Sequence, residues 1–287
     1  MTRSHIGAAY RNDFLPAMVW VVSLMKLARH VVIKLAETRI DPTGVRQLLN
    51  ALGVSEDGAK RFAEAPPSAE TLTELAGRLC YESFEIGLNP NVTKIRGTNK
   101  EYLENILLKG DGSVLEHGQV SFAFLNVSRI LTHELVRHRV GIAVSQESLR
   151  YVRLKEIKIW LPDELMEATK DAMIKAARQS EEAYLKLAET IPWDKMNMDA
   201  KKRMTSALRR ILPDGLATNI IWTANHRTIR WVIEMRTDPS AEVEIRMLFD
   251  QVAQICKRDF PNLYQDFERT ELPDGTGSWK PKFRSKV

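Results

Sequence analysis

An apolar run of eight residues, VSFAFLNV (120–127), passes directly into a helical pattern at Ser128. Alternating aromatic and β-branched residues are typical of a strand, whereas the apolar residues after Ser128 recur with the spacing of a helix. Helical stretches outnumber strands along the chain, and the predicted strands gather in its first half. With no internal repeat, this pattern predicts a single α+β domain.

Glycine, proline and capping residues divide the rest of the chain into further elements. Ser68 and Asn99 are expected to cap the helices that follow them. The predicted elements are strands over 31–36 and 120–127, helices over 44–53, 55–65, 68–81, 100–109 and 128–139, an irregular stretch over 140–147, a strand-like segment over 148–160, and helices over 163–190, 197–210, 217–236 and 240–258.

The charge balance is mildly basic. Lys and Arg number 42 and Asp and Glu number 37, which gives a net charge of +5 over 287 residues. An excess of this size suits anionic small molecules such as nucleotides. It is also uneven, because seven basic residues fall within one segment: Arg129, Arg137, Arg139, Arg150, Arg153, Lys155 and Lys158.

The cysteines and the apolar stretches bear on the compartment. Two cysteines, Cys80 and Cys256, are too few for a disulfide framework and form no CxxC, so we expect a cytoplasmic protein without a metal site. Cys80 is expected to be a buried core thiol rather than an attacking thiolate, and most tryptophans and methionines are expected to lie in the core. The most apolar stretch, 14–25, is shorter than the roughly 20 residues of a membrane span.

We expect three regions along the chain. Residues 1–30 are interpreted as an N-terminal extension, and one alternative places the true start at Met25. Residues 31–276 form the domain. Residues 277–287 form a basic, mobile tail.

Three common functional motifs are absent from the sequence. HELVRH resembles the zinc-protease HExxH, but His133 and His138 are five residues apart and lie about 140° apart around a helix. They cannot both face one zinc ion. The chain also lacks GxGxxG after a strand and GxxxxGK[ST]. A zinc protease, a Rossmann flavoprotein and a P-loop enzyme are therefore disfavoured.

The helix predicted from Ser128 carries charged residues on one face. Glu134, Arg137 and His138 stand at positions i, i+3 and i+4. Most charged faces of this kind are simply solvated. The run Arg137-His138-Arg139 is also suited to gripping an anion, because guanidinium groups bind phosphate oxygens in pairs. The sequence therefore leaves a solvated face and an anion grip as alternatives.

The whole stretch RHRVGIAVSQESLRY (137–151) is more specific than its parts. It resembles the signature of the flavin-dependent thymidylate synthases (the ThyX family), in which RHR is followed after a short spacer by Ser/Asn-Glu/Gln-x-Ser-x-Arg-Tyr. Other segments are similar to that family in order and spacing: LAGRLCYES (75–83), SVLEHGQVSF (113–122), LPDGLATNIIWTANHRTIRWVIEMR (212–236), AEVEIR (241–246) and YQDFERTELPDGT (264–276).

The resemblance implies a fold and an activity. The fold is a single domain with a twisted, mainly antiparallel sheet packed against long helices. The activity is reductive methylation of dUMP at C5 to give dTMP. Methylenetetrahydrofolate would donate the carbon, and NADPH would donate electrons through FAD held between the subunits of a homotetramer. The resemblance implies no membrane partner and no specific nucleic acid.

The resemblance also implies roles for single residues. Arg236 is expected to favour ionisation of uracil N3, since a fixed guanidinium beside an acidic N–H stabilises the anion. His117 is expected near the reacting rings. The nucleotide-binding residues would be Glu134, Arg137, Gln146, Glu147, Ser148, Leu149, Arg150, Arg209 and Arg236. The FAD-binding residues would be Gln119, Arg137, His138, Arg139, Asn225, His226 and Arg227.

Arg236 has a plainer explanation when it is considered alone, which is a surface ion pair with Glu234 or Asp238. The context favours a site. Asn225 and Arg236 are eleven residues apart, about three helical turns, so one helix would line one site.

The chain departs from the family pattern at three places. The spacer between RHR and Ser148 is one residue longer, and Trp231 and Ser240 stand where many members have histidine. These changes keep open a second enzyme, a C5-methylase acting on UMP or another pyrimidine nucleotide in a specialised pathway. A basic nucleic-acid-binding protein is a distant alternative, because the arginine-rich stretch lacks an aromatic platform.

Overall fold

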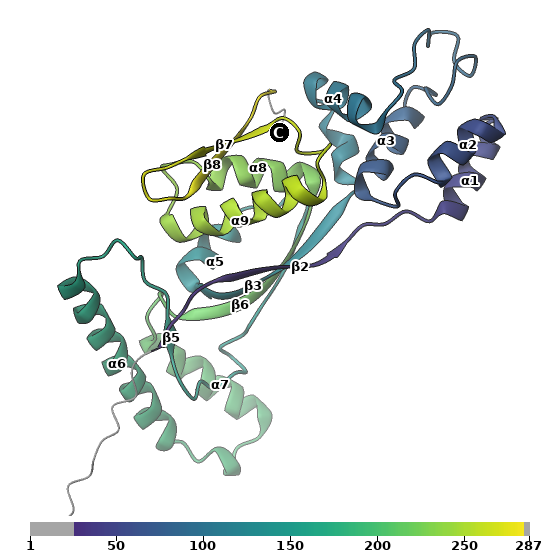
Figure 1. Cartoon of the computed structure of the whole chain (residues 1–287). Helices are drawn as coiled ribbons and strands as arrows, with labels where there is room; N and C mark the ends of the chain where they lie inside the picture. The colour runs from purple at the N-terminus through teal and green to yellow at the C-terminus, as the bar shows by residue number, and fades with distance from the viewer. Residues whose placement is uncertain (1–25, 284–287) are drawn as a thin grey trace, which may run out of the picture.

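A four-stranded antiparallel sheet with the strand order β2-β3-β6-β4 forms the centre of the structure (Figure 1). The computed structural model describes residues 26–283, so the alternative start at Met25 lies outside the described residues. The four strands are β2 (Val31–Glu37), β3 (Gln119–Ser128), β4 (Ile142–Gln146) and β6 (Ala217–Asn225). The α+β class and the antiparallel sheet agree with the prediction.

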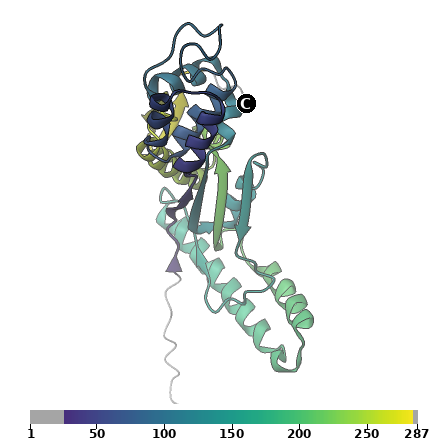
Figure 2. The same ribbon diagram turned by 90° about the vertical axis from the view of Figure 1, so that its right-hand side faces the viewer.

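Helices cover one face of this sheet and extend beyond both of its ends. α8 and α9 lie over the sheet, α1 to α4 gather at one end, and α6 and α7 form an arm at the other (Figures 1 and 2). The helices are α1 (Pro42–Ala51), α2 (Glu56–Ala63), α3 (Ala69–Leu79), α4 (Asn99–Lys109), α5 (Arg129–Leu135), α6 (Glu167–Glu189), α7 (Met198–Leu208), α8 (His226–Arg236) and α9 (Val243–Asp259).

Two short pairs of strands complete the fold. β1 (Lys26–Leu27) runs parallel to β5 (Lys158–Ile159), beside the arm. β7 (Phe267–Glu271) and β8 (Gly277–Pro281) form an antiparallel hairpin next to α8 and α9. Part of the predicted N-terminal extension therefore takes part in strand pairing.

The core lies between the sheet and α9. Phe122, Phe124 and Trp222 project from β3 and β6, and their rings stack on one another. Phe249 of α9 meets Trp222 edge to face at 5.7 Å between ring centroids. All four side chains are fully buried, and burial of aromatic area on this scale fixes how α9 packs on the sheet.

Capping follows the expected chemistry, with one shift of register. Ser68 caps α3 by accepting a hydrogen bond from the Thr71 amide. The cap of α4 is Thr98 rather than Asn99, because the Thr98 hydroxyl and the Glu101 carboxylate form a reciprocal capping box.

Four segments differ from the sequence prediction. α5 ends at Leu135 instead of 139, since the chain turns and the Arg137 amide bonds back to Glu134. Residues 142–146 form a strand, and residues 217–225 form a strand instead of a helix. Each finds its hydrogen-bond partners in strands that are distant in sequence. Of the strand-like segment 148–160, only Lys158–Ile159 is a strand.

The C-terminal region is more ordered than predicted. Residues 277–281, expected to begin a mobile tail, form β8. Trp279 is buried there, and its indole donates to Asp250 at 2.7 Å. Cys80 differs from the prediction as well, because it is exposed while Cys256 is buried. Several methionines are also exposed, among them Met166 and Met198.

Candidate functional site

Arg236, the last residue of α8, connects two segments that are distant in sequence. Its Nε donates to His138 Nε2 at 2.7 Å, and its Nη1 donates to Glu134 Oε2 at 2.9 Å. Its Nη2 donates to the main-chain oxygen of Glu134 at 3.1 Å. The ion pair of Arg236 is therefore with Glu134, and not with Glu234 or Asp238 as its sequence neighbours suggest.

The loop after α5 brings His138 to Arg236 by running along α8. Near the other end of the loop, the Thr228 hydroxyl donates to Val140 O at 2.8 Å and the Asn225 amide donates to Gly141 O at 3.1 Å. Asn225 is the N-cap of α8. The loop thus contacts both ends of the helix, and Asn225 and Arg236 lie at opposite ends of the same helix.

Gly141 is required where the loop meets Asn225. Its φ is +70°, which is a left-handed conformation that favours glycine. A Cβ atom there would lie 2.4 Å from Asn225 Nδ2 and 2.6 Å from Thr228 Oγ1. The close approach of the backbone to α8 therefore depends on the missing side chain.

His138 is a neutral hydrogen-bond acceptor in this arrangement. Its side chain is buried, and burial followed by the nearby charge of Arg236 lowers its pKa to about 4. Because Nε2 accepts from Arg236, the ring proton resides on Nδ1. Within residues 26–283, Nδ1 has no hydrogen-bond partner. The Trp231 ring meets the imidazole edge to face at 4.7 Å.

Arg137 and Arg139 flank this buried histidine and are both exposed. Neither guanidinium forms an ion pair within the described part of the chain. The guanidinium groups of Arg137 and Arg139, which lie on either side of the buried His138 ring, can therefore donate paired hydrogen bonds to phosphate oxygens. The anion grip therefore stays a prediction, since exposed and unpaired guanidinium groups would also be found on a solvated surface.

A second group of predicted residues lies between β4 and α7. Gln146 Nε2 donates to Thr132 at 3.3 Å, and Asn219 donates to the Glu147 carboxylate at 3.1 Å. Ser148 Oγ accepts from the Arg150 amide at 3.3 Å.

The two ends of this group face different surroundings. Leu149 is buried in a small apolar cluster, so only its main chain is open to a ligand. Arg150 lines a basic cavity of about 460 Å³ with Lys202, Arg203 and Arg210 of the α7 region. Arg209 lies in the turn that follows α7, and its charge is one cause of the lowered pKa of Arg129, after burial.

A third group gathers where α8 begins. Gln119 and Asn225 face each other across β3 and β6. Arg227 Nη1 donates to Glu116 at 2.6 Å. His117 lines a cavity of about 410 Å³ against α1 and α3.

His226, which the resemblance marks for FAD binding, lies in the interior of the described residues. Its ring is fully buried against Phe260 and lies 3.0 Å from the Tyr264 hydroxyl, and burial lowers its pKa to about 3. A role of His226 in FAD binding stays a prediction.

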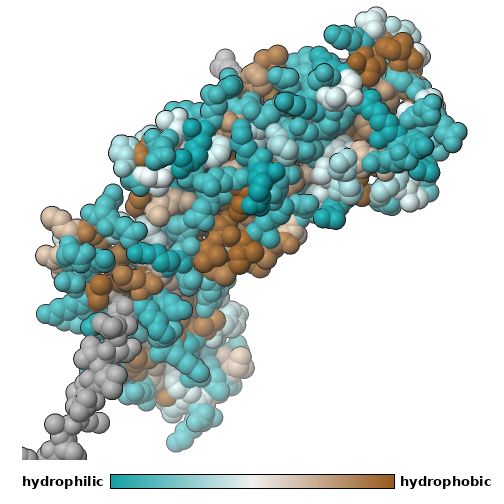
Figure 3. All heavy atoms as spheres, in the orientation of Figure 1, coloured by the Kyte–Doolittle hydropathy of each residue, from teal (hydrophilic) through white to brown (hydrophobic). Residues whose placement is uncertain are grey.

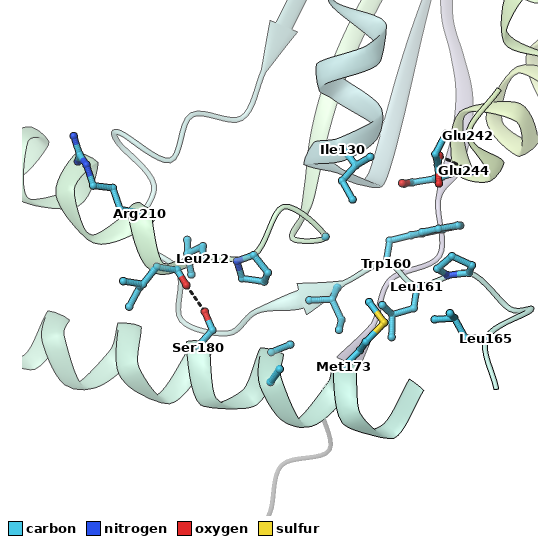
Figure 4. Close-up of a pocket in the computed structure, with 17 residues that line it drawn as sticks. Ile130, Trp160, Leu161, Leu165, Met173, Ser180, Arg210, Leu212, Glu242 and Glu244 are labelled. Atoms are coloured by element: carbon cyan, nitrogen blue, oxygen red, sulfur yellow. Dashed lines mark hydrogen bonds between the residues drawn. The ribbon is translucent and has the colours of Figure 1, made fainter. Parts of the chain in front are cut away.

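A further cavity of about 510 Å³, lined by side chains that sequence reasoning did not single out, lies between α6 and the ends of α5 and α9 (Figure 4). Trp160, Leu161 and Met173 form its apolar wall, and Glu242 and Glu244 stand at one side. Burial raises the pKa of Glu244 to about 7, although its carboxylate accepts from the amide and hydroxyl of Ser128. The only sequence signal was the segment AEVEIR, which contains both glutamates.

The predicted residues therefore form three groups within one chain. No hydrogen bond or ion pair among residues 26–283 joins Arg150 or Arg209 to Arg236. The same residues contain no group of three His, Cys, Asp or Glu side chains that could hold a metal ion. No helix in this range is long and apolar enough to cross a membrane.

The fold and these groups define an α+β protein whose arginines surround a neutral histidine and a glutamate, a surface suited to an anionic nucleotide. The comparison with known proteins is more specific. A family model described as "Thymidylate synthase complementing protein" matches residues 61–262. The chain belongs to this family.

The relatives carry a consistent name. The flavin-dependent thymidylate synthase of Mycobacterium tuberculosis (strain ATCC 25618 / H37Rv) is 36% identical over 211 residues, which cover 71% of this chain and 82% of the relative. The protein of the same name from Mycolicibacterium gilvum (strain PYR-GCK) is 35% identical over 233 residues, covering 76% and 91%. That from Mycobacterium marinum (strain ATCC BAA-535 / M) is 36% identical over 213 residues, covering 72% and 83%.

Proposed function

We propose that this chain is a flavin-dependent thymidylate synthase that methylates dUMP at C5 to give dTMP, with methylenetetrahydrofolate and NADPH as co-substrates. The observation that carries the proposal is the fixed guanidinium of Arg236. Five N–H groups belong to a guanidinium, and three of them are engaged by Glu134 and His138. One N–H remains on each terminal nitrogen for a ligand.

Those two N–H groups are suited to a pyrimidine ring. A preorganised cation beside uracil N3 stabilises the anion that forms when N3 loses its proton, and electron density then rises at C5. Arg236 is partly buried, so its charge is less screened than that of a surface arginine. We therefore assign Arg236 as a catalytic residue. His117, at the cavity beside α3, is assigned a place near the reacting rings.

The cationic donors of the chain fit a flavin dinucleotide. Arg137 and Arg139 are exposed without an ion pair in the described range, and Asn225 and Arg227 lie at the start of α8. The buried Nδ1 of His138 also lacks a partner there. Guanidinium groups can donate paired hydrogen bonds to the pyrophosphate oxygens of FAD. Neutral N–H groups can donate to the polar edge of its isoalloxazine ring. FAD supplies hydride chemistry when it is bound.

We assign the nucleotide phosphate and ribose to the second group of residues. Arg150 and Arg209 would hold the phosphate, and the segment 146–149 would complete the pocket, with Leu149 acting through its main chain. Because this group does not contact Arg236 in one chain, a complete site requires a second copy. We propose a homotetramer with its active sites between subunits.

The outer face of the sheet supports self-association. Val31, Ile33 and Leu35 of β2 are 44%, 41% and 51% exposed, and Ile221 of β6 is 45% exposed. Figure 3 shows apolar side chains gathered over this central region. An exposed apolar patch on a sheet marks an interaction surface.

The two cysteines form no disulfide, and a reducing cytoplasm fits that state.

The proposal is tested on the purified protein by its absorbance spectrum and by product analysis. We expect flavin bands, NADPH oxidation stimulated by dUMP over UMP, and dTMP identified by mass spectrometry when methylenetetrahydrofolate is added. Equal stimulation by UMP would favour the specialised methylase that Trp231 and Ser240 keep open. A colourless protein that takes up no added FAD and forms no methylated nucleotide would refute both enzymes.

A further inference from the structure

The packing around Arg236 raises the question of what keeps its guanidinium in place. Glu134 holds the two terminal nitrogens, but Nε is held only by the lone pair of His138 Nε2. The His138 ring must therefore stay in one orientation and must stay unprotonated. A protonated ring has no acceptor and would repel Arg236.

Trp231 is placed to meet both requirements. It lies on α8 five residues before Arg236, and its ring meets that of His138 edge to face at 4.7 Å between centroids. Trp231 is itself partly buried and packs against the main core. Its large, rigid side chain therefore restricts the rotation of the imidazole and keeps water away from it.

We propose that Trp231 is a positioning residue for the thymidylate synthase reaction, because it holds His138 as the neutral acceptor that orients Arg236. This inference rests on the proposed function.

The charges around His138 decide how its protonation responds to Trp231. Burial is the main cause of its lowered pKa of about 4, and the charge of Arg236 is the second cause. The charged groups that face it or lie next to it are Arg236 on α8, Glu134 at the end of α5, Glu242 at the N-cap of α9 beside Glu134, and its neighbours Arg137 and Arg139.

Removing the indole should therefore raise the pKa of His138. Water would reach the imidazole, while the repulsion by Arg236 would remain, so the pKa would move from about 4 toward its usual value without passing it. As the pH falls through that new value, His138 would become protonated and Arg236 would lose its acceptor. Activity would then fail at a higher pH than in the wild-type enzyme.

The test compares the holoenzyme with Trp231→Ala, Trp231→Phe and a control, Trp193→Ala. Trp193 is also partly buried, but it packs near the end of α6, where Arg153 lies over its ring. The rate of dTMP formation is measured from pH 3.5 to pH 9 with saturating dUMP, so that the range includes the His138 pKa of about 4. The ultraviolet difference spectrum of bound 5-fluoro-dUMP reports ionisation of N3 without turnover. Thermal unfolding separates loss of fold from loss of position.

We expect Trp231→Ala to lower kcat by about tenfold to a hundredfold, as misplaced catalytic groups do. The acid limb of its pH profile should move up by at least one pH unit, and bound 5-fluoro-dUMP should ionise less. Trp231→Phe should restore most of the rate, and Trp193→Ala should leave the profile unchanged. A double variant, His138→Gln with Trp231→Ala, should lose the acid-limb shift because glutamine accepts without titrating.

Two results would overturn the inference. One is a Trp231→Ala enzyme whose kcat falls equally at every pH. The other is an unshifted acid limb in both Trp231 variants with normal ionisation of 5-fluoro-dUMP. Failure of the proposed function is distinguishable, because the wild-type holoenzyme would then form no dTMP at any pH.

Discussion

Arg236 and Glu134 are joined twice, once through the carboxylate at 2.9 Å and once through the main-chain oxygen at 3.1 Å. The second bond is independent of the charge of Glu134. The guanidinium is therefore fixed to the backbone at the end of α5 as well as to a side chain. A cation fixed in this way costs little reorganisation when charge develops on a bound ring.

Replacement of Arg236 by lysine should abolish this geometry while keeping the charge. An ammonium group lacks the planar fork that reaches Glu134 and His138 together. We expect Arg236→Lys to lower kcat for dTMP formation by about 10²- to 10³-fold, with a much smaller change in the Kd for dUMP. Steady-state kinetics and equilibrium binding measure the two quantities.

Arg258→Gln is the matched control for that experiment. Arg258 is exposed and pairs only with its neighbour Asp259 within the described residues, so its loss should leave both quantities unchanged. An Arg236→Lys enzyme with wild-type kcat would show that the guanidinium is not part of the chemistry.

The sequence predicted those elements whose pattern is local. The alternation in 120–127 and the cap at Ser68 were sufficient for β3 and α3. Sequence periodicity predicts a helix over residues 217–225, although Thr218, Ile220 and Thr223 are β-branched. Their strand depends on β3 and β4, which lie far away in the sequence and become partners only after folding.

The same limit applies to the site. Glu134 and His138 could be placed near each other from their spacing, but their common partner Arg236 is 102 and 98 residues away from them. A family resemblance marked Arg236, whereas its nearest charged neighbours suggested another ion pair. The buried state of His226 had no signal in a single sequence, because an exposed and a core histidine have the same pattern.

Arg150 provides a test of the proposed phosphate grip. Replacement by glutamine removes a charge-assisted contact, which is worth about 1.5–3 kcal/mol. We therefore expect Arg150→Gln to raise the KM for dUMP by roughly tenfold or more. Any turnover of deoxyuridine, which has no phosphate, should not change. Arg29→Gln, at an exposed ion pair with Asp163, serves as the control.

The comparison of dUMP with deoxyuridine separates a loss of phosphate binding from a general loss of activity. If Arg150→Gln impaired dUMP and deoxyuridine equally, the residue would support the fold of the segment rather than the phosphate.

Gly141 should be intolerant of substitution. Gly141→Ala introduces a Cβ 2.4 Å from Asn225 Nδ2 at a φ of +70°, so the loop must withdraw from the start of α8. Strain of this kind costs about 1–3 kcal/mol of unfolding free energy. We expect a lower unfolding temperature and weaker FAD retention during gel filtration.

Gly53→Ala is the natural comparison for Gly141→Ala. Gly53 also has a positive φ, of +76°, but nothing lies within 4 Å of an added Cβ. It should lose stability without losing FAD. Equal loss of FAD in both variants would mean that general destabilisation, and not the loop at α8, controls cofactor retention.

Glu244 should make the stability of the protein depend on pH. Its pKa is raised to about 7 by burial, so between its usual value and pH 7 the folded state holds a proton that the unfolded state releases. Stability therefore falls as the pH rises through this window. Glu244→Gln has no proton to lose and keeps groups that can bond to Ser128. We expect the free energy of unfolding of Glu244→Gln to equal that of the wild type near pH 4.5. At pH 8 the variant should be more stable than the wild type by at most about 3 kcal/mol.

Denaturant unfolding at both pH values measures this difference, and Glu104→Gln on the exposed side of α4 is the control. A variant that is less stable than the wild type at pH 8 would contradict the argument, because it would mean that the ionised carboxylate is favoured by its bonds to Ser128. The Glu244 carboxylate accepts hydrogen bonds from the amide and the hydroxyl of Ser128. These bonds lower its pKa, but burial raises it by more. The nearby Glu242 and Glu134 add repulsion in the same direction, so ionisation of Glu244 destabilises the folded state.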